Sequence, residues 1–373
     1  MNVPEKMQAV VLTGHGGLDK LVFKEDVPTP VPADNEVLIQ VAACGLNNTD
    51  VNTRSGWYSK AVSEATTGDA YNEIDESDPT WGGEPLKFPH IQGADVAGTV
   101  VAAGAKADSS LIGKRVITDN WLRDWNNPLN KNTTGYFGSE CFGGYAQYTT
   151  IDHRNVGVVN CDLTDAELAT FSCSYTTAEG MLSRAEVSKG DTVLVSGASG
   201  GVGSALIQLA KRRGAIVVGL AAEHKHATLK DLGADALLPR NPSDLAQALQ
   251  ESIGQSTVSV VADIVGGSSF GPLIETLERG GRYTCSGAIA GPIVDFDLRT
   301  FYLNDLTFSG STVVPPNIFT DLVSYIEKGE VKPVLAATYP LAQLRDAQQA
   351  FIDKQHSGNI CLLYTSPSPR DRG

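Results

Sequence analysis

The sequence lacks the features of a membrane protein and of a nucleic-acid-binding protein. Its 373 residues carry 29 basic and 43 acidic side chains, a net charge of −14. This acidity argues against nucleic acid or an anionic membrane surface as the main partner. No apolar run approaches the ~20 residues of a membrane span, and the N-terminus has no apolar signal core. We therefore expect a cytoplasmic protein without a membrane or nucleic-acid partner.

Paired cysteines are also lacking. None of the six cysteines forms a CxxC pair, and in a chain this long that pattern argues against a disulfide framework and a four-cysteine zinc lobe. They are scattered as Cys44, Cys141, Cys161, Cys173, Cys285 and Cys361.

A glycine-rich turn is the strongest motif that is present. The turn Ser196–Gly203 follows a β-branched apolar run and precedes a helix-like stretch that ends at Gly214. A second β run, 215–220, follows at once, so the pattern predicts a βαβ dinucleotide-binding unit. The alternative is a glycine turn that binds no nucleotide. The predicted contacts to the cofactor are Ser199, Gly200, Gly201, Val202 and Gly203.

The chain divides by pattern into three parts. Residues 1–160 contain short β runs with glycine turns, typical of a small barrel or sandwich. Residues 161–309 alternate strand and helix, which predicts a doubly wound parallel sheet. Residues 310–363 contain two amphipathic helices and a last strand. The predicted class is α/β.

Five further motifs, taken in order, carry a resemblance to a known family. The chain resembles the medium-chain dehydrogenase/reductase superfamily, nearest to its zinc-free quinone oxidoreductase-like branch. This resemblance implies a GroES-like catalytic domain over 1–160, a Rossmann domain over 161–309, a segment 310–363 that completes the catalytic domain, and a homodimer. The motifs are Gly45–Asp50, Arg54–Tyr58, Gln92–Gly98, Gly143–Tyr148 and Gly280–Tyr283.

Two stretches depart from the family pattern. Residues 59–87 form an insertion with seven acidic residues and two lysines, which we interpret as a loop. It is either a flap over the mouth of the active site or a solvated excursion. The polar, proline-bearing tail 364–373 resembles no family C-terminus, and we expect it to be disordered and without function.

The resemblance also shows which metal ligands are missing. Zinc members of the superfamily place Cys and His where this chain has Asn47 and Ala94. Asp95 stands at the neighbouring acidic position, and Cys173 aligns with a third ligand position. One carboxylate and one thiol do not close a catalytic zinc site. We therefore expect no zinc.

Without a metal, reduction of an activated C=C is easier to support than alcohol oxidation. Charge then gathers on a carbonyl oxygen, which needs hydrogen-bond donors. The resemblance places Asn47 and Tyr58 at the nicotinamide end, and both can donate. We predict them as catalytic residues; the alternative is that Asn47 only fixes its loop and Tyr58 only walls the pocket.

Cofactor choice is predicted from the end of the second Rossmann strand. NAD-preferring enzymes place a carboxylate there, whereas this chain has Ala221 followed by His224 and Lys225. This cluster suits the 2′-phosphate of NADPH. Glu223 is counter-evidence, because a shift of one or two residues would return it to the NAD role; Lys225 could also be only a solvated charge.

Further cofactor contacts are predicted at other strand ends. Arg240 follows the third Rossmann strand, and loops at strand C-termini face the ligand. The resemblance places Thr177 on the helix near the nicotinamide. Ser286, Gly287 and Ala288 follow a later strand.

The sequence thus predicts an NADPH-dependent reductase of quinones or α,β-unsaturated carbonyl compounds. The alternatives are a zinc-type alcohol dehydrogenase relative and an NADPH-binding protein without turnover. The substrate is a small molecule that the sequence does not identify.

Overall fold

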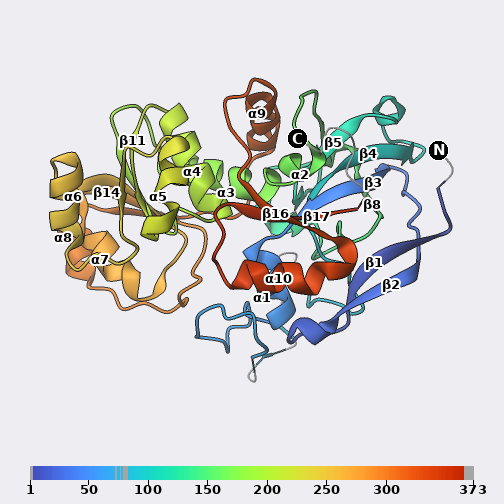
Figure 1. Cartoon of the computed structure of the whole chain (residues 1–373), viewed down its shortest axis with the longest axis horizontal. Helices are drawn as coiled ribbons and strands as arrows, with labels where there is room; N and C mark the ends of the chain where they lie inside the picture. Colours follow the sequence, from blue (N-terminus) through green and yellow to red (C-terminus); the bar gives the residue numbers. More distant parts are fainter. Residues whose placement is uncertain (1–2, 72–73, 76, 79–82, 365–373) are drawn as a thin grey trace.

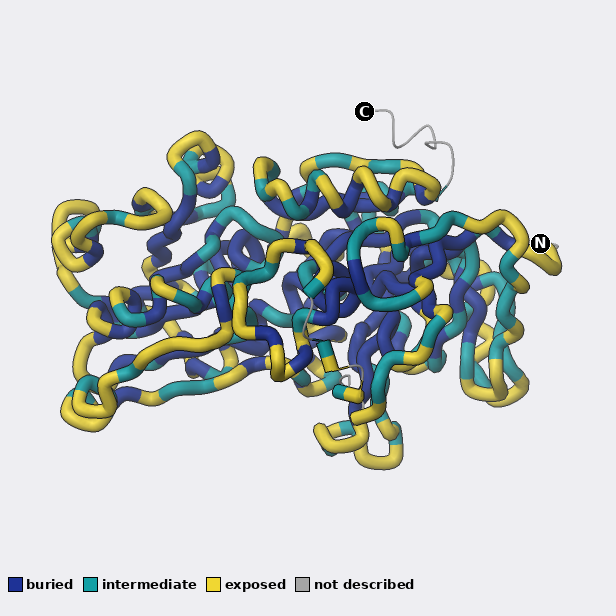
Figure 2. The backbone as a smooth tube through the Cα atoms, turned by 90° about the horizontal axis from the view of Figure 1, so that it is seen from below, coloured by how far each residue is buried: buried dark blue, intermediate teal, exposed yellow. Residues whose placement is uncertain are grey.

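The computed structural model describes residues 3–71, 74–75, 77–78 and 83–364, which form two domains side by side (Figure 1). Buried residues fill the interior of both halves, and the connecting loops are exposed (Figure 2). Within the described ranges, no helix is long and apolar enough to cross a membrane. The predicted α/β class and the predicted parallel sheet are confirmed.

The catalytic domain is built on a seven-stranded sheet in the order β16-β17-β3-β4-β5-β9, with β8 also paired to β3. In its central strand, β3, apolar side chains such as Ile39 and Val41 are buried in the core. Short helix α1 (Asn48–Ser55) follows β3 directly. The strands are β3 (Glu36–Gly45), β4 (Asp95–Ala103), β5 (Arg115–Thr118), β8 (Tyr148–Asp152), β9 (Val156–Val158), β16 (Leu335–Pro340) and β17 (Asn359–Leu363).

Two small antiparallel pairs flank this sheet: β1 (Lys6–Leu12) with β2 (Leu21–Pro28), and β6 (Trp121–Leu122) with β7 (Gly135–Tyr136).

The cofactor domain contains a parallel sheet in the order β12-β11-β10-β13-β14-β15, the strand order of a Rossmann fold. Helices cover it, so its central strands are buried and read as continuous apolar runs. The strands are β10 (Thr192–Val195), β11 (Ile216–Leu220), β12 (Ala236–Leu238), β13 (Val258–Asp263), β14 (Leu277–Cys285) and β15 (Thr307–Gly310). The helices are α3 (Ser172–Arg184), α4 (Gly201–Arg212), α5 (His226–Asp231), α6 (Leu245–Ile253), α7 (Phe270–Glu275) and α8 (Leu298–Leu303). The short helix α2 (Asp165–Leu168), which precedes them, packs on β3 and β4 of the first sheet.

After the cofactor domain, the chain returns to the first sheet. Helix α9 (Pro316–Glu327) packs near α3, and α10 (Leu344–Ile352) packs on β16 and β17. In Figure 1 this red segment crosses from the cofactor domain to the catalytic domain. This segment also contacts the glycine turn: the Gly358 N–H donates to the Ser199 carbonyl oxygen at 2.8 Å.

The insertion 59–87 contains no helix or strand among its described residues, and it lies below α1 in Figure 1. Arg54, which is fully buried, fixes its first part. The guanidinium donates to the carbonyl oxygens of Gly68 (3.0 Å) and Gly16 (2.6 Å) and to Gln348 Oε1 (2.9 Å). Burial lowers the Arg54 pKa to about 10. The insertion's Glu73, Glu76 and Trp81 lie outside the described residues.

Our prediction for the start of the tail is wrong. Tyr364 continues the chain from β17 in an ordered position: its N–H donates to the Ala42 carbonyl oxygen at 3.0 Å, and its hydroxyl donates to that of Gly144 at 2.5 Å. The aromatic side chain packs against the catalytic-domain core. Residues 365–373 lie outside the described residues.

Candidate functional site

Two adjoining cavities lie between the domains, where the glycine turn meets the return segment. The nucleotide cavity, about 370 Å³, runs from the glycine turn to Ala221 and Arg240. The reaction cavity, about 420 Å³, extends from the turn to Asn47, Tyr58 and Cys173. Both are lined by Asn48, Gly201, Val202, Ile264, Ile289 and Phe351, so together they form one elongated site.

The glycine turn leaves the N-terminus of α4 open to this site. Gly200 is the extended N-cap residue, and a Cβ built on it would meet nothing closer than the Gly197 carbonyl oxygen at 3.7 Å. At Gly203 a Cβ would lie 2.3 Å from that same oxygen, so the helix packs too tightly there for any side chain. A bare helix N-terminus beside a long cavity fits the pyrophosphate of a dinucleotide. Ser199, Gly200, Gly201 and Val202 line the nucleotide cavity.

Three cationic side chains line the nucleotide cavity, and among the described residues no Asp or Glu does. Lys225 Nζ donates to the carbonyl oxygens of Lys354 (2.7 Å) and His356 (2.6 Å). The Lys225 side chain is therefore buried and hydrogen-bonded, and the alternative that it is only a solvated charge is wrong. Burial, with a contribution from Arg240, lowers the Lys225 pKa. A concentration of positive charge without lining carboxylates suits the phosphates of a nucleotide.

The third cation, Lys354, was not predicted from the sequence. Its Nζ lies 2.9 Å from Asn48 Oδ1 and 3.7 Å from the ring centre of Phe351. Burial, and then the nearby charge of Lys225, lower the Lys354 pKa to about 7. The residue has a φ of 54°, the left-handed region that residues with a Cβ seldom adopt. No local sequence pattern identifies Lys354 as a site residue. It lies at the cavity only because the segment 310–363 folds back against the first domain.

Of the other residues predicted around the ribose, some line the nucleotide cavity and others do not. Ala221 lines the nucleotide cavity. Glu223 and His224 are exposed and do not line it. His224 therefore does not join Lys225 and Arg240 in the lining of the cavity. The His226 ring lies 3.1 Å from the Ala221 carbonyl oxygen.

The family resemblance places zinc ligands at Asn47, Ala94 and Cys173, with Asp95 at the neighbouring acidic position. Of these residues, Asn47 and Cys173 line the reaction cavity. Asp95 accepts hydrogen bonds from Asn47 Nδ2 (3.0 Å), Asn120 Nδ2 (2.7 Å) and the Cys173 N–H (2.9 Å). Its carboxylate is therefore already satisfied by uncharged donors. Burial nonetheless raises the Asp95 pKa to about 6, because desolvation outweighs these bonds.

The remaining positions do not complete a metal site. Tyr136 donates its hydroxyl to Cys173 Sγ at 3.3 Å, and burial raises the pKa of that thiol well above its usual range. Ala94 has no ligand atom. Catalytic zinc needs three deprotonated or neutral protein ligands and an open position, and these residues do not fit it. No group of three His, Cys, Asp or Glu side chains that could hold a metal occurs within the described ranges.

Both predicted catalytic residues line the reaction cavity. The Tyr58 hydroxyl interacts with the side chains of Thr49 and Asn52, and burial raises its pKa, so the phenol keeps its proton at neutral pH. Asn47 gives one amide hydrogen to Asp95, and its backbone N–H donates to Asp50 Oδ2 at 2.8 Å. Both side chains thus line the cavity with part of their hydrogen-bonding capacity already used within the protein.

The strand ends of the cofactor domain supply the opposite wall. Ser286, Gly287 and Ala288 follow β14 and line the reaction cavity, as does Thr177 on α3. Sequence reasoning missed Ser311, which follows β15 in the same way. Its hydroxyl is buried, lines this cavity and has no hydrogen-bond partner among the described residues. The strand-end rule that pointed to Ser286 could have found it.

The two domains match two family profiles. Residues 33–160 match the alcohol dehydrogenase GroES-like domain, and residues 201–328 match a family described as zinc-binding dehydrogenase. The quinone oxidoreductase of Pongo abelii is 26% identical over 96% of this chain and 98% of its own length. The NADPH-dependent alkenal/one oxidoreductase of Arabidopsis thaliana, a chloroplast protein, is 26% identical over 98% of this chain and 81% of its own length.

A solved structure is more similar still. The crystal structure of a Sinorhizobium meliloti 1021 protein with a provisional alcohol dehydrogenase name is 44% identical, covers 97% of this chain and 98% of its own, and superposes with a TM-score of 0.87. With both domain profiles in order and an elongated dinucleotide site between them, the chain belongs to the medium-chain dehydrogenase/reductase superfamily and is an NAD(P)H-dependent oxidoreductase.

Proposed function

We propose that this protein is a metal-independent, NADPH-dependent reductase of quinones or of the C=C bond of α,β-unsaturated carbonyl compounds. The observation that carries the proposal is the hydrogen bonding of Asp95. Its carboxylate accepts from two amides and a backbone N–H, next to the positions at which the resemblance places zinc ligands. The names of the quinone and alkenal/one oxidoreductases support the same reaction class.

The residues of the reaction cavity suit this chemistry. When bound, NADPH would supply the hydride for the β-carbon of an enone, and the π electrons would move toward the carbonyl oxygen. The Tyr58 hydroxyl would donate to that oxygen as its negative charge develops. A proton taken up at the α-carbon then completes the saturated product. Thr177 and Ser286 lie where they can orient the nicotinamide end.

The direct test is NADPH oxidation with a panel of quinones, enals, enones and enoyl thioesters. We expect turnover with quinones or simple enones and none with saturated ketones. Coenzyme A thioesters should be poor acceptors, because the acidic insertion repels their phosphates. Tight NADPH binding without oxidation by any acceptor would instead identify a cofactor-binding protein without turnover.

The protein should contain no stoichiometric zinc. Elemental analysis of protein purified without chelators is expected to give far less than one zinc per chain, because Asn47 and Ala94 supply no zinc ligand. Activity should survive dialysis against a chelator. A value near one, with activity lost on chelation, would favour the zinc-type alcohol dehydrogenase alternative.

Replacing Tyr58 by Phe should lower turnover without weakening NADPH binding. Loss of one donor to a developing oxyanion costs ~10²–10³ in kcat. Stopped-flow measurement of hydride transfer, with NADPH affinity by fluorescence, separates the two effects. Tyr148→Phe, on β8 away from both cavities, is the matched control. Unchanged hydride transfer in Tyr58→Phe would leave Tyr58 as a wall of the cavity.

Arg240→Ala should weaken NADPH more than NADH. Arg240 is a cleaner probe than Lys225, whose loss would also leave two backbone carbonyls without their donor. Loss of a charge-assisted bond of ~1.5–3 kcal/mol weakens binding ~10- to 100-fold, and this loss should shrink as salt rises. Arg299→Ala, on exposed α8, is the control. Equal weakening of both cofactors would remove Arg240 from the phosphate site.

NADPH affinity should fall as pH rises through about 7. Lys354 has a pKa of about 7, so it is charged below this pH and neutral above it. An anionic cofactor binds the charged form better and raises its pKa, so affinity is highest on the acid side. Titrations between pH 6 and 9 should show the decline in the wild type and a flatter profile in Lys354→Arg, which stays charged. The same decline in both proteins would exclude Lys354 as its source.

A further inference from the structure

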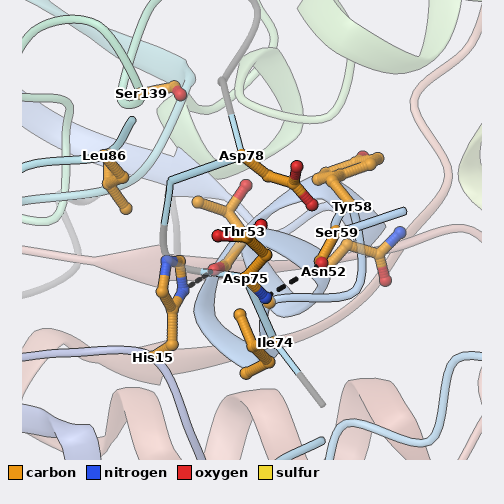
Figure 3. A pocket seen from close by; sticks show the side chains of 11 residues that line it. His15, Asn52, Thr53, Tyr58, Ser59, Ile74, Asp75, Asp78, Leu86 and Ser139 are labelled. Atoms are coloured by element: carbon orange, nitrogen blue, oxygen red, sulfur yellow. Dashed lines mark hydrogen bonds between the residues drawn. The ribbon is translucent and has the colours of Figure 1, made fainter. Parts of the chain in front are cut away.

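A third cavity, about 220 Å³, lies under the insertion beside the reaction cavity (Figure 3). We call it the side chamber. The residues that matter for its chemistry are His15, Asn52, Tyr58, Asp75, Asp78 and Ser139. They come from four separate parts of the chain: the β1–β2 connection, α1 with the turn after it, the insertion, and the loop after β7. The family motifs account for α1 and Tyr58 but not for the insertion that closes the chamber.

The side chamber and the reaction cavity have a common wall. Asn52 and Tyr58 line both of them. Since Tyr58 is the predicted donor to the substrate carbonyl, a molecule bound at that hydroxyl already lies against the boundary of the side chamber. The part of such a molecule remote from its reacting carbon would therefore lie next to this space.

The chamber holds polar groups that are short of partners. Ser139 is 7% exposed, and its Oγ has no hydrogen-bond partner among the described residues. His15 Nδ1 lies 2.9 Å from the Thr53 carbonyl oxygen, which can only accept. The neutral ring therefore carries its proton on Nδ1 and offers Nε2 as an acceptor. A buried hydroxyl without a partner is costly, and a ligand atom would satisfy it.

The acidic lining of the side chamber favours cationic or hydrogen-bond-donating ligands over anionic ones. Asp75 and Asp78 both line it, and none of its described lining residues is Lys or Arg. Asp78 Oδ2 accepts one bond, from the Lys60 N–H at 2.9 Å, and no described residue donates to its other oxygen. Ile74 and Leu86 supply apolar surface. This lining accepts hydrogen-bond donors and repels anions.

The insertion is seated against the cofactor domain as well. The Thr66 N–H donates to the carbonyl oxygen of Ile289 at 2.9 Å, and Thr66 Oγ1 donates to Asn52 Oδ1 at 3.1 Å. Ile289 lines both the reaction and the nucleotide cavities. The segment that closes the side chamber therefore also contacts the wall of the cofactor site, as the flap interpretation of the insertion requires.

We propose that the side chamber is a substrate subsite, which takes the end of the substrate remote from the reacting double bond. That end carries hydrogen-bond donors, as hydroxyl or ammonium groups, and no carboxylate or phosphate. This inference rests on the proposed reductase function, and it names the class of substrate.

The test compares enones that differ only at the far end. A series of α,β-unsaturated methyl ketones carries on the β-carbon a chain ending in methyl, hydroxyl, ammonium or carboxylate. Each kcat/KM is divided by that for methyl vinyl ketone, which is too short to reach the chamber. In the wild type we expect the hydroxyl and ammonium substrates to exceed the methyl one by about 3- to 10-fold, and the carboxylate to fall below it.

Two variants assign the selectivity to the chamber. Ser139→Ala should remove most of the hydroxyl advantage, and Asp78→Asn most of the ammonium advantage, each judged on the ratio to methyl vinyl ketone. Glu64→Gln removes an equal charge from an exposed position of the insertion outside the chamber and should preserve both ratios. Ratios that are equal for all four tails, or that do not change in either chamber variant, would overturn the subsite.

Binding separates this result from the proposed function. Calorimetry with saturated ketones bearing the same four tails measures the subsite without turnover, in the presence of NADP⁺. Tail selectivity in binding without reduction of any enone would keep the subsite and refute the reductase. Reduction of methyl vinyl ketone without tail selectivity would keep the reductase and refute the subsite.

Discussion

The close approach of backbone to ligand at the N-terminus of α4 is the constraint around which both domains are arranged. The helix can present its free N–H groups only because Gly200 carries no side chain and Gly203 packs against the Gly197 carbonyl oxygen. The turn is also where the domains meet, since Gly358 of the return segment donates to Ser199. Without the return segment, the glycine turn would lose this hydrogen bond to the catalytic domain. The cavity along α4 would then have only one wall.

Buried charge in this protein is stabilised largely by uncharged partners. Asp95 is held by amides and a backbone N–H, Arg54 by two carbonyls and an amide, and Lys225 by two carbonyls. Desolvation therefore dominates their protonation, which raises the pKa of Asp95 and lowers those of Arg54 and Lys225. In the nucleotide cavity the same arrangement leaves cationic charge for an anionic ligand to neutralise. Near the reaction cavity, it supplies the Asp95 carboxylate with three donors from within the protein.

The insertion contacts both the catalytic domain and the cofactor domain. Its described residues are fixed by Arg54 to the catalytic domain and by Thr66 to the cofactor domain. A loop held at both sides of a cleft differs from a solvated excursion, because its position depends on how the domains sit. Two of its described acidic side chains, Asp75 and Asp78, line the side chamber and make that cavity unfavourable to anions.

The sequence by itself determined the class of fold and the kind of cofactor, because both depend on local patterns. Strand and helix periodicity and a glycine turn between them are properties of neighbouring residues, and Asn47 and Ala94 stand at positions that a motif defines. The tertiary structure alone decided which side chains complete the sites. Lys354 meets Asn48 across 306 positions, and Ser139 meets the insertion only in the folded chain. Lys225 could be assigned a charge from the sequence, but not the two carbonyls that hold it. Such contacts depend on how the return segment and the insertion pack between two domains, and no spacing of residues along the chain encodes that packing locally.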